Sequence, residues 1–248
     1  MTRRRFYVPG DAIRDRTAHL PRGPSHHLRD VLRLGPGETV EIFDGEGNGY
    51  AGTVAFDGSE VTVGGLEPLP AERAEAPLVL AAALIRPARF EWMLEKAAEL
   101  GVHAVVPVSC RRSGVRIPAD TAARKCERWN RIAREAARQC GRSLAPRVHP
   151  PEDWDAVVSR RDFQGYARLV FHERAQQPWE PGLLGTAPGG VLLCTGPEGG
   201  WEEREIAEAV RAGFRACSLG RWTLRAETAA VAALAVVGYH IRLRDGGM

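Results

Sequence analysis

The residues best placed to do chemistry lie in two turns in the C-terminal part of the sequence. The first is Thr195-Gly196-Pro197-Glu198-Gly199-Gly200, and the second begins at Leu219-Gly220 and leads to Leu224-Arg225. Each turn joins an apolar, strand-like run to a helical pattern. Glycine lets main-chain N–H and C=O groups approach a ligand closely, so two such turns predict a pocket for an adenine edge and ribose hydroxyls.

The charges beside the first turn argue against a phosphate ligand. The helix predicted after Gly200 begins Glu202-Glu203-Arg204-Glu205, and its three carboxylates already satisfy the positive end of the helix dipole. No Gly-x-Gly-x-x-Gly and no Gly-Lys-Ser/Thr occurs in this segment. A cofactor with positive charge fits better, and Glu198 would attract the sulfonium and ammonium of S-adenosylmethionine. The alternative is that this turn only connects a strand to a helix.

Arg225 and Glu227 flank the start of the last predicted helix. An acid in the first helical turn commonly stabilises the helix dipole, so a capping role is the simpler interpretation of Glu227. Arg225 lies between an apolar loop and a buried helix, where a charge needs a partner. Arg225 is therefore the stronger catalytic candidate. His172, which follows a predicted strand, is a further candidate at the border of the pocket.

The composition indicates an ordinary globular protein. The 248 residues are 44% apolar, and the longest apolar run, Thr228 to Gly238, is too short to cross a bilayer. The N-terminus is basic without an apolar signal core, so we expect a cytoplasmic protein that does not insert into membranes. The five cysteines form no Cys-x-x-Cys pair and the histidines show no metal-ligand spacing, so we expect neither disulfides nor a metal.

Positive charge is concentrated in one segment of a chain whose net charge is +3. Residues 1–70 have a net charge of −2, whereas Arg111 to Arg147 contains eleven Lys or Arg and three acids, a net charge of +8. Such a segment is typical either of a solvated helix face or of a surface that contacts nucleic acid.

The patterning predicts two domains. Residues 1–70 form a small β domain, residues 71–77 a Pro- and Glu-rich linker, and residues 78–248 an α/β domain. In the β domain, alternating runs around Asp44-Gly45 and Asp57-Gly58 predict hairpins, and a short helix is expected around His26 to Leu34. The α/β domain alternates apolar strands with helices, which is the pattern of a parallel sheet covered by helices.

The elements of the α/β domain follow from the same periodicity. Strands are expected at 78–85, 104–108, 167–171, 191–195 and 216–219, and helices from Pro87 and over 121–140, 202–212 and 227–243. The last helix is apolar almost all round, so it must be covered on several sides, and a second subunit would provide part of that cover.

Several motifs, taken in their order along the chain, resemble one known family. They are the two turns, Leu224-Arg225-Ala226-Glu227-Thr228-Ala229, Arg89-Phe90-Glu91 with Lys96-Ala97-Ala98-Glu99-Leu100-Gly101-Val102, Gln139-Cys140-Gly141-Arg142, Arg5-Phe6-Tyr7 and His27-Leu28-Arg29-Asp30-Val31-Leu32-Arg33. In these motifs the chain is similar, over almost its whole length, to the bacterial small-subunit ribosomal RNA uracil-N3 methyltransferases of the SPOUT superfamily.

The resemblance implies a fold, a cofactor and an assembly. The expected fold is α/β, with a C-terminal SPOUT-type domain that contains a parallel sheet and a trefoil knot, preceded by a small PUA-like β-barrel domain. S-adenosylmethionine would bind at the knot of a homodimer in which both subunits build each active site. The expected cofactor-binding residues are His172, Thr195, Gly196, Pro197, Glu198, Gly199, Gly200, Leu219, Gly220, Leu224 and Arg225.

The implied substrate is ribosomal RNA of the small subunit, and basic residues in two regions are the candidates for binding it. They are Arg3, Arg4, Arg5, His27, Arg29 and Arg33 in the small domain and Arg112, Arg116, Arg138 and Arg142 in the basic segment. Contacts with phosphates would make this binding salt-dependent. Phe6 and Tyr7 either stack on bases or, in the simpler interpretation, are buried in the β domain.

Methylation of uracil N3 requires that the N3 proton leave and that the resulting anion be stabilised. We expect Arg225 to donate to a uracil carbonyl oxygen, and Glu227 to act as a base or to orient Arg225. One departure is visible, because members of the family usually have Arg at the position of Trp222. Two alternatives stay open: a non-catalytic RNA-binding factor of ribosome assembly, and a SPOUT methyltransferase acting on a ribose 2′-oxygen or on guanine N1.

Overall fold

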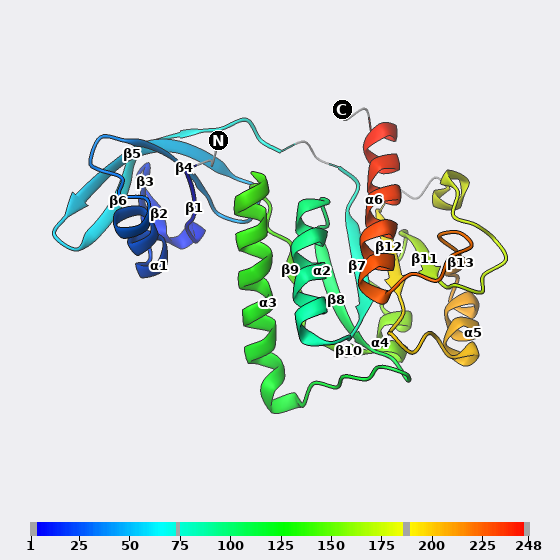
Figure 1. Cartoon of the computed structure of the whole chain (residues 1–248). Coiled ribbons are helices and arrows are strands. Elements are labelled where there is room, and N and C mark those ends of the chain that lie inside the picture. The colour runs from blue at the N-terminus through cyan, green and yellow to red at the C-terminus, as the bar shows by residue number, and fades with distance from the viewer. Residues whose placement is uncertain (1–3, 73–74, 186–188, 246–248) are drawn as a thin grey trace. The chain divides into compact units, whose positions relative to one another are not determined.

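The computed structural model describes residues 4–72, 75–185 and 189–245. The chain divides into two compact units, and Figure 1 traces the chain through both. The first unit contains residues 1–73 together with Arg134–Ala145, and the second contains residues 74–133 and 146–248. The predicted boundaries at 70 and 78 stay a prediction. The assignment of residues 134–145 to the N-terminal unit is a finding that local patterning does not provide.

The first unit is built on a curled sheet. Within residues 4–72 its strands are β1 (Arg5–Tyr7), β2 (Ile13–Arg14), β3 (Thr17–His19), β4 (Thr39–Phe43), β5 (Gly49–Asp57) and β6 (Glu60–Pro68). The order is β1-β4-β5-β6-β3-β2, with β1 parallel to β4 and the other pairs antiparallel. The β5–β6 hairpin turns at Asp57-Gly58, as predicted, and Gly58 has a φ of 56°.

Alternation along these strands places one set of side chains in the core of the first unit. Val40 and Ile42 of β4 and Val61 and Val63 of β6 are buried together with Leu28. Short helical turns close the core: η1 (Gly10–Ala12), α1 (Arg22–His26) and η2 (His27–Val31). The helix expected around His26 to Leu34 therefore begins earlier and stops at Val31, because Arg33 adopts a left-handed conformation with φ of 53°.

The second unit is built on a parallel sheet. Its strands within the described residues are β7 (Leu78–Ala83), β8 (Ala104–Ser109), β9 (Arg147–Val148), β10 (Glu152–Asp153), β11 (Ala167–Phe171), β12 (Val191–Thr195) and β13 (Arg215–Cys217). The order is β10-β8-β7-β12-β11-β13, with β9 beside β8, and all the pairs are parallel. Its longer strands have the bounds expected from the sequence to within two residues.

Helices cover both faces of this sheet, which explains its continuous apolar strands. The helices are α2 (Pro87–Glu99), α3 (Ala119–Cys140), α4 (Trp154–Ser159), α5 (Glu203–Arg211) and α6 (Ala226–Arg244), with a short turn η3 (Pro181–Leu184). The residues of α3 from Arg134 onward belong to the first unit. Leu78, Leu80 and Ala82 of β7 share a core with α2 and α6. The alternate residues Val79 and Ala81 share the opposite core with α4 and α5.

The ends of the helices follow the expected rules. Pro87 occupies the first turn of α2, where its missing N–H costs nothing. Glu202 and Glu205 form a capping box at the start of α5, and Glu205 is fully buried. The expectation that carboxylates occupy this helix terminus is therefore confirmed.

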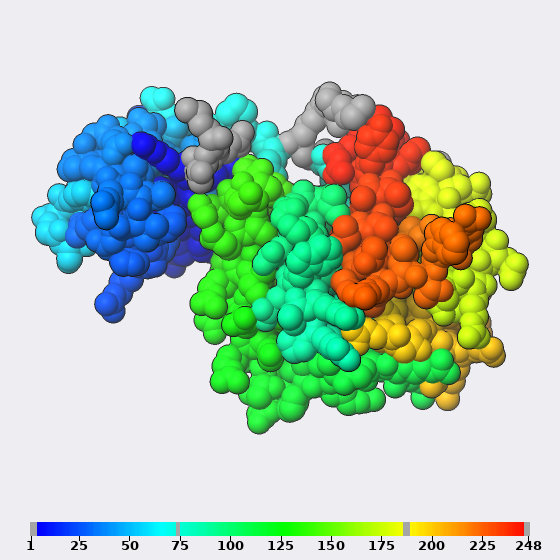
Figure 2. Space-filling model, in the orientation of Figure 1, coloured from blue at the N-terminus to red at the C-terminus, as the bar shows by residue number. Residues whose placement is uncertain are grey.

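Helix α6 is the one described helix long and apolar enough to cross a membrane by length and composition. It packs against α2, β7 and β12 through buried residues that include Ala230, Leu234 and Val237. Figure 2 shows α6 at the molecular surface beside α2. Tyr239 (52% exposed), Val236 (46%) and Leu243 (43%) leave one side of the helix uncovered within the chain.

Candidate active site

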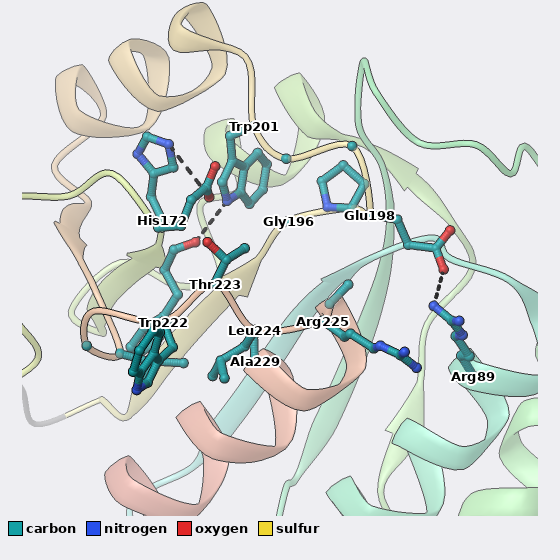
Figure 3. Close-up of a pocket in the computed structure, with 18 of the residues that line it drawn as sticks. Arg89, His172, Gly196, Glu198, Trp201, Trp222, Thr223, Leu224, Arg225 and Ala229 are labelled. Carbon is teal, nitrogen blue, oxygen red and sulfur yellow. Dashed lines mark hydrogen bonds and ion pairs between the residues drawn. The ribbon is translucent and has the colours of Figure 1, made fainter.

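A pocket of about 610 Å³ lies where the parallel strands of the second unit end. Its wall is formed by the residues that follow the carboxyl ends of β7, β11, β12 and β13 (Figure 3). This is the usual position of a ligand in an open α/β sheet, because the loops after parallel strands meet at one edge. The two turns singled out in the sequence both line this pocket, so the prediction that they meet is confirmed.

The first turn takes its shape from Trp201. The indole Nε1 donates a hydrogen bond of 2.9 Å to the carbonyl oxygen of Phe171, which anchors the turn to the end of β11. A Cβ at position 196 would lie 2.8 Å from the same indole nitrogen, so only glycine fits beneath the ring. Gly200 has a φ of 70°, which other residues rarely adopt.

The second turn lines the pocket and has main-chain groups without partners in the described part of the chain. Within the described residues, no hydrogen bond engages the N–H or C=O groups of residues 220–224. Main-chain groups that lack partners are normally paired with water or with a ligand. This is the arrangement expected of a site that recognises an adenine edge and ribose hydroxyls through the backbone.

The structure brings together almost all of the predicted cofactor-binding residues. The pocket is lined by His172, Gly196, Pro197, Glu198, Gly199, Gly200, Leu219, Gly220, Leu224 and Arg225. Thr195 is different, because it is the last residue of β12, is buried, and does not line the pocket.

The charges of the pocket form two groups. Glu198 Oε1 accepts a hydrogen bond of 2.8 Å from Arg89 Nη1, and Glu198 Oε2 is 3.9 Å from Arg86 Nε. The negative charge of Glu198 is therefore compensated by two guanidinium groups. On the other side, Glu173 Oε2 lies 3.8 Å from His172 Nε2, and no arginine pairs with Glu173 among the described residues.

The two catalytic candidates have different surroundings. Arg225 is exposed, lines the pocket, and its side chain has no hydrogen bond or ion pair within the described residues. Glu227 is 8% exposed and lies behind the lining, with Oε1 3.7 Å from Arg89 Nε. Its Oε2 has no hydrogen-bond partner among the described residues. The interaction of Glu227 is thus with Arg89 and not with Arg225.

Sequence reasoning missed part of the pocket wall. Arg86, Arg89, Glu173 and Trp222 line it but were not expected in the site. Arg86 and Glu173 follow β7 and β11 within a few residues, so a signal was available in the rule that parallel strands share their carboxyl edge. Using that signal requires knowing that β7 pairs with β12, which the sequence does not show.

The predicted RNA-binding residues differ in accessibility. Arg4, Arg33, Arg112 and Arg116 are exposed, whereas His27, Arg29, Arg138 and Arg142 are half-buried. Arg3 lies outside the described residues. Phe6 is 2% exposed, which confirms its burial in the β domain, and Tyr7 is half-buried.

Arg5 is buried inside the first unit, with 3% of its surface exposed. Its guanidinium donates to the Gly141 carbonyl oxygen and to Ser143 Oγ, and lies 4.9 Å from the centre of the Phe43 ring. These contacts join residues 134–145 to the β1–β4 edge of the sheet, so the position of Arg5 gives it a structural role and no surface for RNA.

The described residues contain no group of three or more His, Cys, Asp or Glu side chains arranged to hold a metal ion. The five cysteines are free, and three of them, Cys110, Cys194 and Cys217, are buried. Burial raises the pKa of the Cys217 thiol to about 12, so this side chain remains protonated and inert.

Models of known families match both units. A model of the RNA methyltransferase domain matches residues 72–238, and a model of the RNA methyltransferase PUA domain matches residues 24–63. The fold and the pocket therefore define an RNA methyltransferase that carries a PUA domain.

Curated relatives narrow this class. The chain is 34% identical over 237 residues to the ribosomal RNA small subunit methyltransferase E of Synechocystis sp., covering 94% of this chain and 76% of the relative. It is 30% identical to the protein of the same name from Bacillus subtilis, covering 89% of each. The chain belongs to the ribosomal RNA small subunit methyltransferase E family.

Solved structures agree with this assignment. A methyltransferase from Legionella pneumophila in complex with the bound cofactor SAM is 29% identical, with a TM-score of 0.84 and coverage of 98% of both chains. The Neisseria gonorrhoeae ribosomal RNA small subunit methyltransferase E bound to S-adenosyl methionine is 30% identical, with a TM-score of 0.82 and coverage of 96% of this chain and 97% of that chain.

Proposed function

We propose that this protein transfers the methyl group of S-adenosylmethionine to N3 of a uridine in small-subunit ribosomal RNA. The observation that carries the proposal is that two small-residue turns line one pocket at the carboxyl edge of a parallel sheet, and that the main chain of residues 220–224 has no hydrogen-bond partner among the described residues. The structures similar to this chain include methyltransferases bound to this cofactor. The names of the curated relatives specify small-subunit ribosomal RNA.

The pocket fits the proposed cofactor in size and in chemistry. A volume of about 610 Å³ lies within the range of sites for ligands of this size. The main chain of residues 220–224 and the glycines of the first turn would hold the adenosyl part. Glu173 replaces Glu198 as the carboxylate available to a positively charged group, since Glu198 is already paired with Arg86 and Arg89. When bound, the cofactor supplies the methyl group.

Arg225 is proposed to stabilise the uracil anion. Uracil N3–H is only weakly acidic near neutral pH, so a cation beside a uracil carbonyl oxygen would favour loss of this proton. Arg225 projects from the N-cap position of α6 into the pocket and has no carboxylate partner within the described residues (Figure 3). Its charge is therefore available to the substrate.

Glu227 is proposed to act mainly through Arg89. Its carboxylate is buried and lies 3.7 Å from Arg89 Nε, while Arg89 Nη1 donates to Glu198. Two carboxylates thus fix one guanidinium at the wall of the pocket. A role of Glu227 as general base stays a hypothesis that the pH dependence of the Glu227→Gln variant tests.

The enzyme must reach the N3 edge of its target base. In an RNA duplex this edge is engaged in a base pair, so the target uridine must be unpaired or flipped out of the helix. The exposed arginines, Arg4 and Arg33 on the first unit and Arg112 and Arg116 on the second, are the proposed contacts with RNA phosphates.

The proposal includes a trefoil knot, a homodimer and a cytoplasmic location. The uncovered side of α6, with Val236, Tyr239 and Leu243 spaced three and four residues apart, supports a dimer in which each active site contains residues of both subunits. The knot would bring the two turns together, and a ribosomal RNA substrate supports a cytoplasmic location.

Reverse transcription of ribosomal RNA from a parent strain and from a strain lacking this protein tests the function. An N3-methyl group blocks the pairing edge, so we expect a stop at a uridine in the parent that is absent in the deletion strain. Small subunits from the deletion strain, incubated with the protein and methyl-labelled cofactor, should yield 3-methyluridine after digestion to nucleosides.

Other products would overturn the assignment in distinguishable ways. Label in a 2′-O-methylated nucleoside or in 1-methylguanosine would identify one of the other reaction types. Retention of RNA without binding of the cofactor would identify a non-catalytic assembly factor.

A further inference from the structure

Trp222 has an unusual position for a large aromatic side chain. It is 71% exposed, and it lines the pocket through the same turn that carries Arg225. The other tryptophan and the phenylalanine of the described pocket wall, Trp201 and Phe171, are each 5% exposed and serve the core. Trp222 is therefore the most exposed aromatic side chain of the described wall, since the His172 side chain is 13% exposed.

A neighbouring cation supports the ring of Trp222. The guanidinium carbon of Arg221 lies 4.4 Å from the centre of this ring, a distance at which a cation and an aromatic face attract each other. Both side chains are exposed, so the contact leaves the indole outside the core. An exposed ring that lines a pocket is suited to stacking on another planar group.

The proposed reaction requires such a planar contact, and this inference rests on the proposed function. A uridine that leaves its helix to present N3 loses the stacking of its neighbours, and enzymes that flip bases commonly restore it with aromatic side chains. We propose that Trp222 is the platform on which the extruded uracil stacks. Arg225, three residues further along the same turn, would then contact a carbonyl oxygen of the same base.

In this proposal the base and the cofactor contact different groups of the pocket. The groups suited to the adenosyl part are the main-chain atoms of residues 220–224 and the turn at residues 196–200, whereas 71% of Trp222 is exposed to solvent. Loss of the indole should therefore weaken the use of RNA and leave cofactor binding unchanged.

The test compares Trp222→Ala and Trp222→Phe with the wild type and with Val210→Ala, which removes an exposed side chain from α5 away from the pocket. Steady-state methylation is measured with RNA as the varied substrate, and binding of S-adenosylhomocysteine by calorimetry. We expect Trp222→Ala to lower kcat/KM for RNA by about 5- to 150-fold, mainly through KM, since base–aromatic stacking contributes on that scale. Trp222→Phe, which keeps a ring, should stay within about threefold of the wild type.

A second measurement isolates the contact with the target base. RNA that is abasic at the target position should bind the wild-type protein more weakly than intact RNA does, and Trp222→Ala should cause no further loss with this RNA, because the stacking partner is already absent. Quenching of fluorescence on addition of intact RNA should be larger in the wild type than in Trp222→Phe.

Two results would overturn the proposal while leaving the function intact. If Trp222→Ala methylated uridine N3 at the wild-type kcat/KM, Trp222 would not be the stacking platform. A weaker affinity for S-adenosylhomocysteine with an unchanged KM for RNA would place the indole over the cofactor. Absence of uridine methylation in the wild type would instead contradict the proposed function itself.

Discussion

Arg89 and Arg225 present two guanidinium groups to one pocket, but only one of them has a free charge. Arg89 contacts Glu198 at 2.8 Å and Glu227 at 3.7 Å, so its charge is shared between two carboxylates. Arg225 has no such partner within the described residues. The sequence predicted a partner for the charge of Arg225. This charge is solvated instead, because Arg225 is exposed at the N-terminus of α6 and is not buried beneath the helix.

Arg225→Ala should lower the rate of methyl transfer. Removing a group that stabilises developing negative charge typically reduces kcat by about 10²- to 10³-fold, and we expect a loss of this size. The dissociation constant of S-adenosylhomocysteine should remain within about twofold, since the pocket recognises the cofactor mainly through main-chain atoms. An unaffected methylation rate with intact cofactor binding would remove Arg225 from the mechanism.

Glu227→Gln should have a smaller effect of a different kind. Because the carboxylate acts through Arg89, we expect kcat to fall by less than about tenfold, with the shape of its pH profile unchanged. Arg89→Lys, which alters the same contact from the other side, is the matched variant. If the pH profile of kcat lost one limb in Glu227→Gln but kept its shape in Arg89→Lys, Glu227 would be identified as a general base.

At the scale of the element, the first turn depends on one close contact. Gly196→Ala would place a Cβ 2.8 Å from Trp201 Nε1, and displacing the indole breaks its hydrogen bond to Phe171. We expect a loss of stability of about 1–3 kcal/mol, measured by denaturant unfolding, together with weaker binding of S-adenosylhomocysteine. Gly114→Ala is the control, because a Cβ there meets nothing within 4 Å. Equal behaviour of the two variants would show that the turn adapts.

The elements that could be predicted are those whose pattern is local. The strands β7 and β12 are largely continuous apolar runs, β11 is apolar except for Arg168, and α2 and α5 carry Pro87 and the Glu202–Glu205 box at their starts. Helix α4 was not predicted, because six residues are too few to show a helical period. The parallel pairing of β1 with β4 was not predicted either, since register between distant strands is set by tertiary packing.

The candidate site shows the same division. The two turns could be found because glycine, proline and the strand before each turn are local signals. Arg89 and Glu173 could not, because their place in the wall depends on β12 lying between β7 and β11. The burial of Arg5 also depends on a contact between distant segments, because its guanidinium donates to Gly141 and Ser143. From the sequence alone, the charge of Arg5 predicted a surface residue.

At the scale of the whole molecule, the uncovered side of α6 predicts self-association. Replacing Val236 and Tyr239 by Glu would place two charges on this apolar side and should convert the proposed dimer to a monomer in light scattering. Methylation should be lost with the dimer, since each site is proposed to need both subunits. Val210→Glu on α5, at an equally exposed apolar position, should leave the mass and the activity unchanged. A wild-type protein that is monomeric at micromolar concentration would contradict the dimer.

RNA binding should depend strongly on salt if exposed arginines contact phosphates. Arg33→Ala and Arg116→Ala should each weaken binding and reduce the slope of log K against log salt by about one. Arg5→Ala should instead lower the stability of the first unit, because its guanidinium is enclosed by Phe43, Gly141 and Ser143. Titrations of RNA at several salt concentrations, with an unfolding curve for each variant, separate the two classes of arginine. If the slope of log K against log salt were unchanged in both Arg33→Ala and Arg116→Ala, the RNA phosphates would contact other residues.

The wall formed by residues 196–200 and 220–224 has a consequence for inhibition. A competitor that met only main-chain atoms there would be insensitive to most side-chain exchanges, because those exchanges leave the backbone path unaltered. Resistance to such a competitor would require a substitution that alters the backbone path, and at Gly196 any side chain would collide with Trp201. Drug resistance at this wall would therefore come at the expense of the enzyme's own folding.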